Sequence, residues 1–188
     1  MPPPPSECRE PWKRCRFSLR QRNGRTTVET VPERVAVKWA PRLGRRLREL
    51  LRESGPVRTI GSLGILLLEL DEASRRPAAW KRLKKLQNEG VVAWASPLLR
   101  DLESELREIL TDEVTVRLRP GADADRRLQD LLRRTGLVLA RRNEFVPNQF
   151  VLRIDHPFGL EVLEVARSLD TRAEVEFATP NFVSEVSR

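Results

Sequence analysis

Few side chains in this sequence could carry out catalysis. The sequence has a single histidine, His156, and two cysteines, Cys8 and Cys15. His156 stands in a segment with proline and glycine that favours a loop, and a catalytic histidine also needs a nucleophile or an orienting carboxylate beside it. The Cys-x6-Cys spacing matches no metal signature, and a structural zinc site needs four ligands. We therefore expect no metal site, no cofactor and no enzyme activity.

Two further groups of residues are better interpreted as structural than as parts of a chemical site. Asp123 and Asp125 fall at the start of a predicted helix, where acidic side chains favour the helix dipole. The segment 61–64, Gly-Ser-Leu-Gly, is too short for a phosphate-binding loop and lies between predicted strands. We expect Cys8 and Cys15 to be free thiols in a polar tail, with a disulfide between them as the alternative.

Length and composition allow one ordinary domain or two small ones. The chain has 188 residues, of which 39% are hydrophobic and 33% charged, and no apolar run is long enough to span a membrane. The formal net charge is +8, and the basic excess lies in the first 110 residues. Such a region could contact nucleic acid, an anionic lipid surface or an acidic partner, or could simply be solvated. The absence of tyrosine disfavours a base-stacking surface for nucleic acid.

The N-terminal segment has the composition of a tail. Residues 2–5 are all proline, and we predict a disordered region over residues 1–15. No apolar segment of the signal-peptide type follows, so the expected localisation is cytoplasmic, with no membrane partner.

The rest of the sequence contains the same pattern twice, at a separation of about 80 residues. In each copy, alternating and helical apolar periods predict the order strand, helix, strand, strand, helix, strand. The predicted elements are 33–39, 43–55, 56–60, 65–70, 80–86 and 91–97 in the first copy, and 112–118, 126–136, 137–141, 149–154, 162–169 and 175–181 in the second.

The predicted fold class is therefore α+β, with two tandem ferredoxin-like (βαββαβ) antiparallel-sheet units. Asn23-Gly24 predicts a hairpin within residues 16–31 that extends or covers a sheet edge of the first unit. The predicted organisation is a tail at 1–15, the hairpin with the first unit at 16–98, a leucine-bearing connector at 99–110, and the second unit with a C-terminal tail at 111–188.

One predicted strand raises a question of burial. Residues 65–68 are Ile-Leu-Leu-Leu, so this strand is apolar on both faces and is expected to be buried on both. Helices cover one face, and the sister unit, a second chain or a partner must cover the other. RNA-recognition modules share this topology but need aromatic residues on the first and third strands, where only Trp39 and Phe150 occur.

Several segments of the second unit resemble a known family. Residues 110–121 (LTDEVTVRLRPG), 148–154 (NQFVLRI) and 175–183 (VEFATPNFV) resemble the opening, third and closing strands of the N-terminal prodomains of subtilisin-like serine proteases. The first unit keeps Ala-Ser-Pro at 95–97 but lacks the following asparagine, and it resembles the extra copy in bacterial subtilases with tandem prodomains. The resemblance covers nearly all of residues 16–183.

The resemblance implies a function in binding a protease. Prodomains of this family act as chaperones and tight inhibitors: the open sheet face packs on surface helices of the protease, and the extended C-terminal tail enters the active-site cleft like a product. Carried onto this sequence, the protease-binding tail runs from 177 to 188. Its residues are Phe177, Ala178, Thr179, Pro180, Asn181, Phe182, Val183 and, at the end, Arg188.

The sequence departs from the family in lacking the catalytic segments Asp-Thr-Gly, His-Gly-Thr-His and Gly-Thr-Ser-Met-Ala. The expected partner is thus a separately encoded subtilisin-like serine protease, inhibited or helped to fold in trans, or else the chain is the front of a split gene. The alternative is a non-catalytic protein-interaction module of the same fold. Nucleic-acid binding through the basic N-terminal region ranks third.

Overall fold

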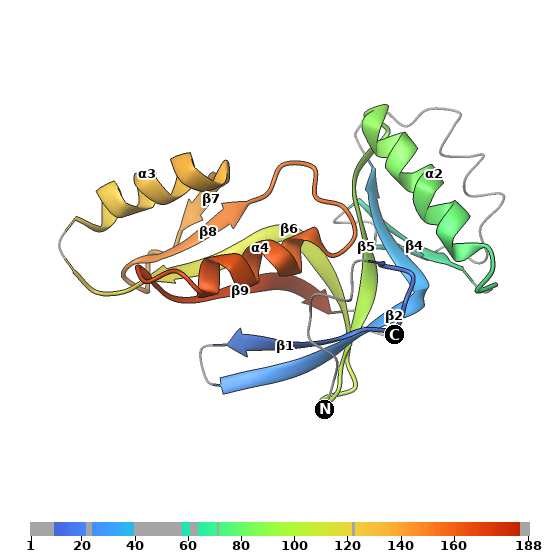
Figure 1. Ribbon diagram of the computed structural model, residues 1–188, viewed down its shortest axis with the longest axis horizontal. Coiled ribbons are helices and arrows are strands. Elements are labelled where there is room, and N and C mark those ends of the chain that lie inside the picture. Colours follow the sequence, from blue (N-terminus) through green and yellow to red (C-terminus); the bar gives the residue numbers. More distant parts are fainter. Residues whose placement is uncertain are drawn as a thin grey trace.

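The computed structural model describes residues 10–21, 24–39, 58–60, 64–70, 72–121 and 123–184. These residues form an α+β structure in which three helices pack on one nine-stranded sheet whose strands all pair antiparallel, as the sequence predicts at this level (Figure 1). The predicted helix at 43–55 lies outside the described residues. The elements are β1 (Arg16–Gln21), β2 (Gly24–Trp39), β3 (Arg58–Ile60), β4 (Ile65–Glu69), α2 (Arg76–Asn88), β5 (Val92–Asp101), β6 (Arg107–Leu118), α3 (Ala124–Thr135), β7 (Val138–Arg142), β8 (Gln149–Arg153), α4 (Glu161–Asp170) and β9 (Val175–Ser184).

The sheet has two halves joined by β5 and β6. The strand order is β3-β4-β2-β5 in the first half and β7-β8-β6-β9 in the second. Leu98 to Arg100 of β5 pair with Arg107 to Ile109 of β6. The predicted connector at 99–110 is therefore mostly strand, and only a short exposed turn separates β5 from β6. Leu98, Leu99, Ile109 and Leu110 are fully buried, which explains why this segment folds into the sheet.

The two halves share a strand order and also a register shift in their strand pairing. The pairing of β2 with β5 shifts register between Val31 and Val35, and that of β6 with β9 shifts between Leu110 and Val114. A proline of the partner strand, Pro97 or Pro180, stands at each shift. Proline has no N–H to donate to a ladder, so a break in regular pairing accommodates it well.

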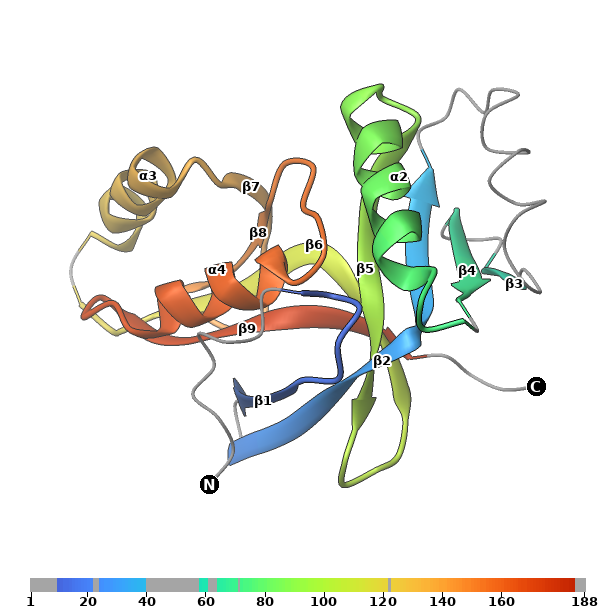
Figure 2. The same cartoon turned by 45° about the vertical axis from the view of Figure 1, so that its right-hand side comes forward.

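The N-terminal hairpin belongs to both halves. β1 pairs with β2, which confirms the predicted hairpin and extends the sheet edge of the first half. Its inward side chains Phe17 and Leu19, however, are buried in the same core as Leu110 and the α4 residue Ala166. The sheet curls so that β1 comes to lie below β9 (Figure 2). The hairpin thus supplies core residues to the second half, which the sequence did not predict.

The predicted two-sided burial of 65–68 is confirmed. Leu66 and Leu68 pack beneath Trp80 and Leu83 of α2. On the opposite face, Ile65 and Leu67 join Trp94, Ile109 and the half-buried Val183 in a separate cluster. Residues from the junction and from β9 therefore contribute to the cover of the face that α2 does not reach.

A loop of the second half docks on the first. Phe158 meets the Trp80 ring edge to face, with ring centroids 5.3 Å apart, and the Gly159 N–H donates to the Ala95 carbonyl at 2.7 Å. The buried Gln87 side chain donates from Nε2 to the His156 carbonyl at 2.9 Å and to that of Pro157 at 3.1 Å. We name residues 155–159 the docking loop.

Residues 10–15 are packed rather than disordered, contrary to the sequence-based expectation. Trp12 packs against the core beneath α2, and Pro11 lies against Gly159 of the docking loop, within 3.4 Å of where a Cβ would be. Cys15 is 5% exposed and disulfide-bonded, so the expectation of a free thiol at this position is wrong. Cys8, with the rest of residues 1–9, lies outside the described residues. The apolar surface of Trp12 and Cys15 explains why this otherwise polar stretch is ordered.

Candidate functional site

The predicted protease-binding residues 177–183 lie in β9. This strand pairs with β6 from Val175 to Ser184, so these residues form part of the sheet. Phe177, Ala178 and Pro180 are buried, and Phe182 and Val183 are half-buried. Arg188 lies outside the described residues. The described part of the proposed tail, up to Ser184, is held in this strand pairing, and residues 185–187 lie outside the described residues as well.

Asn181 fixes the end of β9 at the register shift of β6. Its Oδ1 accepts a hydrogen bond from the Thr115 hydroxyl at 2.6 Å, and its Nδ2 donates to the Glu113 carboxylate at 3.2 Å. The Thr111 hydroxyl donates to the Asn181 carbonyl at 3.1 Å. The side chain thereby replaces ladder bonds lost at the bulge, and it sets the direction in which β9 continues.

Glu113 is itself held by cations on the open face of the second half. Its carboxylate lies 3.1 Å from the Arg141 guanidinium and 3.5 Å from that of Arg153. Glu113, Thr115 and Arg117 alternate along β6 with residues buried beneath the helices. The face that α3 and α4 leave open is accordingly polar around Asn181.

We expect Asn181→Ala to loosen the end of β9 with little change elsewhere. Loss of the two side-chain bonds should lower the free energy of unfolding by about 1 kcal/mol. Hydrogen exchange at Phe182 and Ser184 should accelerate more than exchange at Val175. Ser168→Ala, at an exposed helix position, is the control and should change neither quantity. Uniform acceleration along β9 would show that Asn181 does not act locally.

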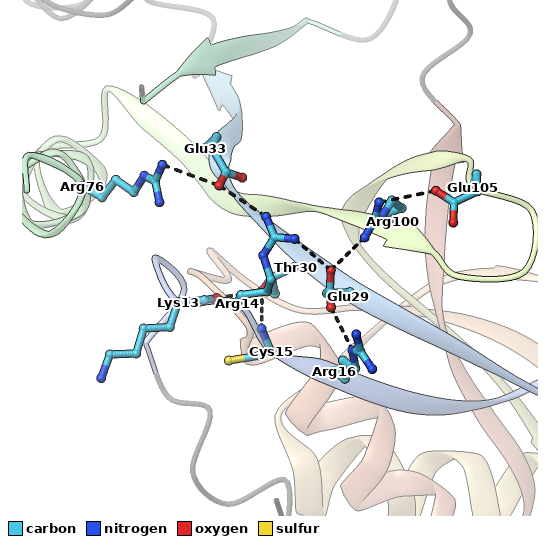
Figure 3. Close-up of polar contacts among 10 residues, drawn as sticks. All are labelled: Lys13, Arg14, Cys15, Arg16, Glu29, Thr30, Glu33, Arg76, Arg100 and Glu105. Carbon is cyan, nitrogen blue, oxygen red and sulfur yellow. Dashed lines mark hydrogen bonds and ion pairs between the residues drawn. The ribbon is translucent and has the colours of Figure 1, made fainter. Parts of the chain in front are cut away.

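A second polar cluster surrounds Glu29 on β2 (Figure 3). Glu29 is only 3% exposed, and its carboxylate accepts hydrogen bonds from Arg16 at 2.8 Å, Arg100 at 3.0 Å and Arg14 at 3.3 Å. The hydrogen bond from Arg16, aided by Arg100 and the Arg14 charge, lowers the pKa of Glu29 against the opposing effect of burial. A buried carboxylate is thus kept charged by three guanidinium groups.

The cluster ties four parts of the chain together. Arg14 also approaches Glu33 at 3.5 Å, and Glu33 lies 3.6 Å from Arg76 at the start of α2. Arg100 reaches Glu105 in the β5–β6 turn at 3.4 Å. Alternation along β2 places the side chains of Glu29 and the buried Val28 on different faces of the strand. Sequence reasoning missed the cluster because its arginines come from three separate segments.

Two further carboxyl groups lie at the β5–β6 hairpin. Asp101 accepts hydrogen bonds from the backbone N–H groups of Ser104 at 2.9 Å and Glu103 at 2.8 Å, and from the Thr26 hydroxyl at 2.7 Å. These bonds, first that from Ser104, lower the pKa of Asp101. Burial, with the nearby Asp101 charge, raises the pKa of Glu108.

The residues considered for catalysis are dispersed. The His156 side chain is 67% exposed, and its ring lies beside Asp155, with 3.4 Å between Nε2 and Oδ1. Asp125 is in the first turn of α3, as predicted, and pairs with Arg142. Among the described residues, no group of three or more His, Cys, Asp or Glu side chains could hold a metal ion. Positions 61–63 of the glycine-containing segment lie outside the described residues.

Comparison with known proteins identifies no relative: no family model matches the chain, and no curated protein or solved structure is significantly similar. No helix in the described ranges has the length and apolar character needed to cross a membrane. The candidate functional site is therefore defined by geometry alone. It comprises the end of β9 pinned by Asn181, with the open polar face beside it.

Proposed function

We propose that the chain consists of two ferredoxin-like, subtilase-prodomain-like units and binds a separately encoded subtilisin-like serine protease as inhibitor or folding chaperone. The strand order of each half supports the first part, since β9-β6-β8-β7 and β5-β2-β4-β3 each place the four strands in the order of a βαββαβ unit. The equivalent register shifts in β2 and β6 support an internal duplication.

The observation that carries the proposal is the fixed end of β9. The Asn181 side chain and the backbone pairing of 182–184 hold this strand against β6 up to Ser184, so the point from which residues 185–188 begin is fixed. A peptide presented in this way loses little conformational entropy when it pairs with strands in a protease cleft. The product-like part of the tail is then 185–188, with Phe182 and Val183 at its base.

The open face of the second half would form the remaining contact. Glu113, Arg117 and Arg153 supply charges of both signs on this face. Charges of this kind fix orientation and association rate more than affinity. The first half, fastened through the docking loop, would hold the second half rigid during binding.

The experiment is inhibition of a subtilisin-like protease, assayed with a chromogenic peptide substrate. We expect saturable inhibition by the full chain and a loss of about tenfold or more in affinity for a chain ending at Ser184. The shortened chain keeps every strand pair described here, so its melting temperature should not change. A chain of full length with 185–188 replaced by Gly-Ser-Gly-Ser tests whether side chains or only length matter.

Equal inhibition by the full and shortened chains would exclude the product-like tail. If neither chain inhibits and both stay intact, the prodomain assignment is wrong and a protein-interaction module remains. Rapid digestion without inhibition would also contradict an inhibitory function.

A further inference from the structure

The outer face of the curled sheet carries a row of arginines across four strands. Arg16 of β1 stands opposite Glu29 of β2, Glu29 opposite Arg100 of β5, and Arg100 opposite Arg107 of β6. In the β1–β2 pair, Arg20 stands opposite Arg25. Directly opposed residues share a face of a sheet, so this side is lined with guanidinium groups. We call it the arginine face and define it by five residues: Arg14, Arg16, Arg25, Arg100 and Arg107.

The positive charge of the arginine face is only partly neutralised. Glu29 at its centre already contacts Arg14, Arg16 and Arg100. Arg25 and Arg107, both exposed, have no carboxylate within ion-pair distance among the described residues. The arginines opposite them are already paired, since Arg20 lies 3.8 Å from Asp170 and Arg100 contacts Glu29 and Glu105. The charge that an added anion could neutralise is therefore that of Arg25 and Arg107.

The face suits a carboxylate more than a nucleic acid. Glu29 shows that its guanidinium groups already converge on a carboxylate, the geometry that the planar arginine fork favours. The neighbouring aromatic residue of β1, Phe17, points into the core on the opposite side, with Leu19 and Val28. Without aromatic side chains, the face offers no platform on which bases could stack.

We propose that the arginine face binds an acidic segment, rich in Asp and Glu, of a protein partner. Carboxylates of that segment would occupy two positions flanking Glu29, one beside Arg107 and one beside Arg25. The surface lies on β1, β2, β5 and β6, and Arg107 is next to Glu108, which pairs with Ser184 of β9. A bound acidic segment would therefore lie near the base of the proposed protease-binding tail, but the proposal does not require that a protease binds there.

The test uses a fluorescein-labelled deca-glutamate peptide and the full chain, with binding followed by fluorescence anisotropy at low salt. We expect saturable binding that weakens about tenfold in the double variant Arg25→Gln/Arg107→Gln. Neither arginine holds a described ion pair, so melting temperature should stay constant. The control Arg126→Gln/Arg167→Gln removes the same charge from exposed sites on α3 and α4, and it should retain the affinity.

Three outcomes would overturn the proposal. They are no saturable binding by the full chain, equal loss of affinity in both double variants, and displacement of the peptide by a deca-thymidylate at equal concentration. The last would identify a general polyanion surface. Retained inhibition of a protease by Arg25→Gln/Arg107→Gln would separate this surface from the proposed inhibitory function.

Discussion

Trp80→Ala should lower the free energy of unfolding by about 4 kcal/mol, the usual cost of removing a buried tryptophan side chain. Trp80 is 1% exposed, projects from α2 onto Leu66 and Leu68 of β4 and supports Phe158 of the docking loop. The truncation leaves a cavity at the place where the two halves meet, so both should lose stability together. Thermal unfolding by circular dichroism, with a fall of about 10 °C in melting temperature, is the measurement.

Trp80→Phe is the informative control. The Trp80 Nε1 is buried and has no hydrogen-bond partner among the described residues. Phenylalanine keeps an aromatic ring against Phe158 while removing this unsatisfied donor, so the loss should be less than half that of the alanine variant. Equal losses in the two variants would mean that the indole makes an interaction beyond ring packing.

Glu29→Gln should be the most destabilising single charge change in the described part of the chain. We expect it to lower the free energy of unfolding by about 2 kcal/mol near pH 7. The variant leaves Arg16, Arg100 and Arg14 facing one another without the carboxylate that holds them. Two of these side chains are more than half exposed, so water screens the repulsion and limits the cost. Urea unfolding of wild type and variant gives the difference directly.

The pH dependence distinguishes charge from packing at this site. The folded-state pKa of Glu29 lies below its ordinary value of 4.5, so its contribution is fully present above that pH and is lost as pH falls through the lowered value. The difference in free energy of unfolding between wild type and Glu29→Gln should narrow as the pH falls below 4.5. Glu33→Gln, at a more exposed carboxylate, should differ little from wild type. A gap that is constant with pH would assign the effect to packing.

Several helices and strands were predictable because their signals are local. Residues 126–136 have a strong helical period ending in Gly136, and α3 spans Ala124–Thr135 with Gly136 in the left-handed conformation. The alternation of residues 112–118 likewise predicts the C-terminal part of β6. Each pattern depends on a few neighbouring residues, so no knowledge of distant contacts is needed.

What sequence reasoning missed depends on contacts between distant segments. Trp12 packs near the docking loop, which lies far from it in the sequence. The local composition contains no sign of that contact and therefore suggested a disordered tail. The junction at 99–110 lacks a hairpin signal of the Asn-Gly type, and its strands form because β2 and β9 complete their pairing. Asn181 was identified through a family resemblance, but its hydrogen bonds with Thr115 and Glu113 require the register shift in β6.

Residues 103–107, at the short turn between β5 and β6, are exposed to solvent. The two halves of the sheet on either side of this turn exchange core residues. β1 contributes Phe17 to the core of the second half, and the docking loop contributes Phe158 to the first. A nick in this turn would therefore give two fragments still joined by strand pairing and by exchanged core residues. If the proposed protease cleaved this turn, the two fragments would stay associated as a folded two-chain complex, and the inhibitor would not unfold.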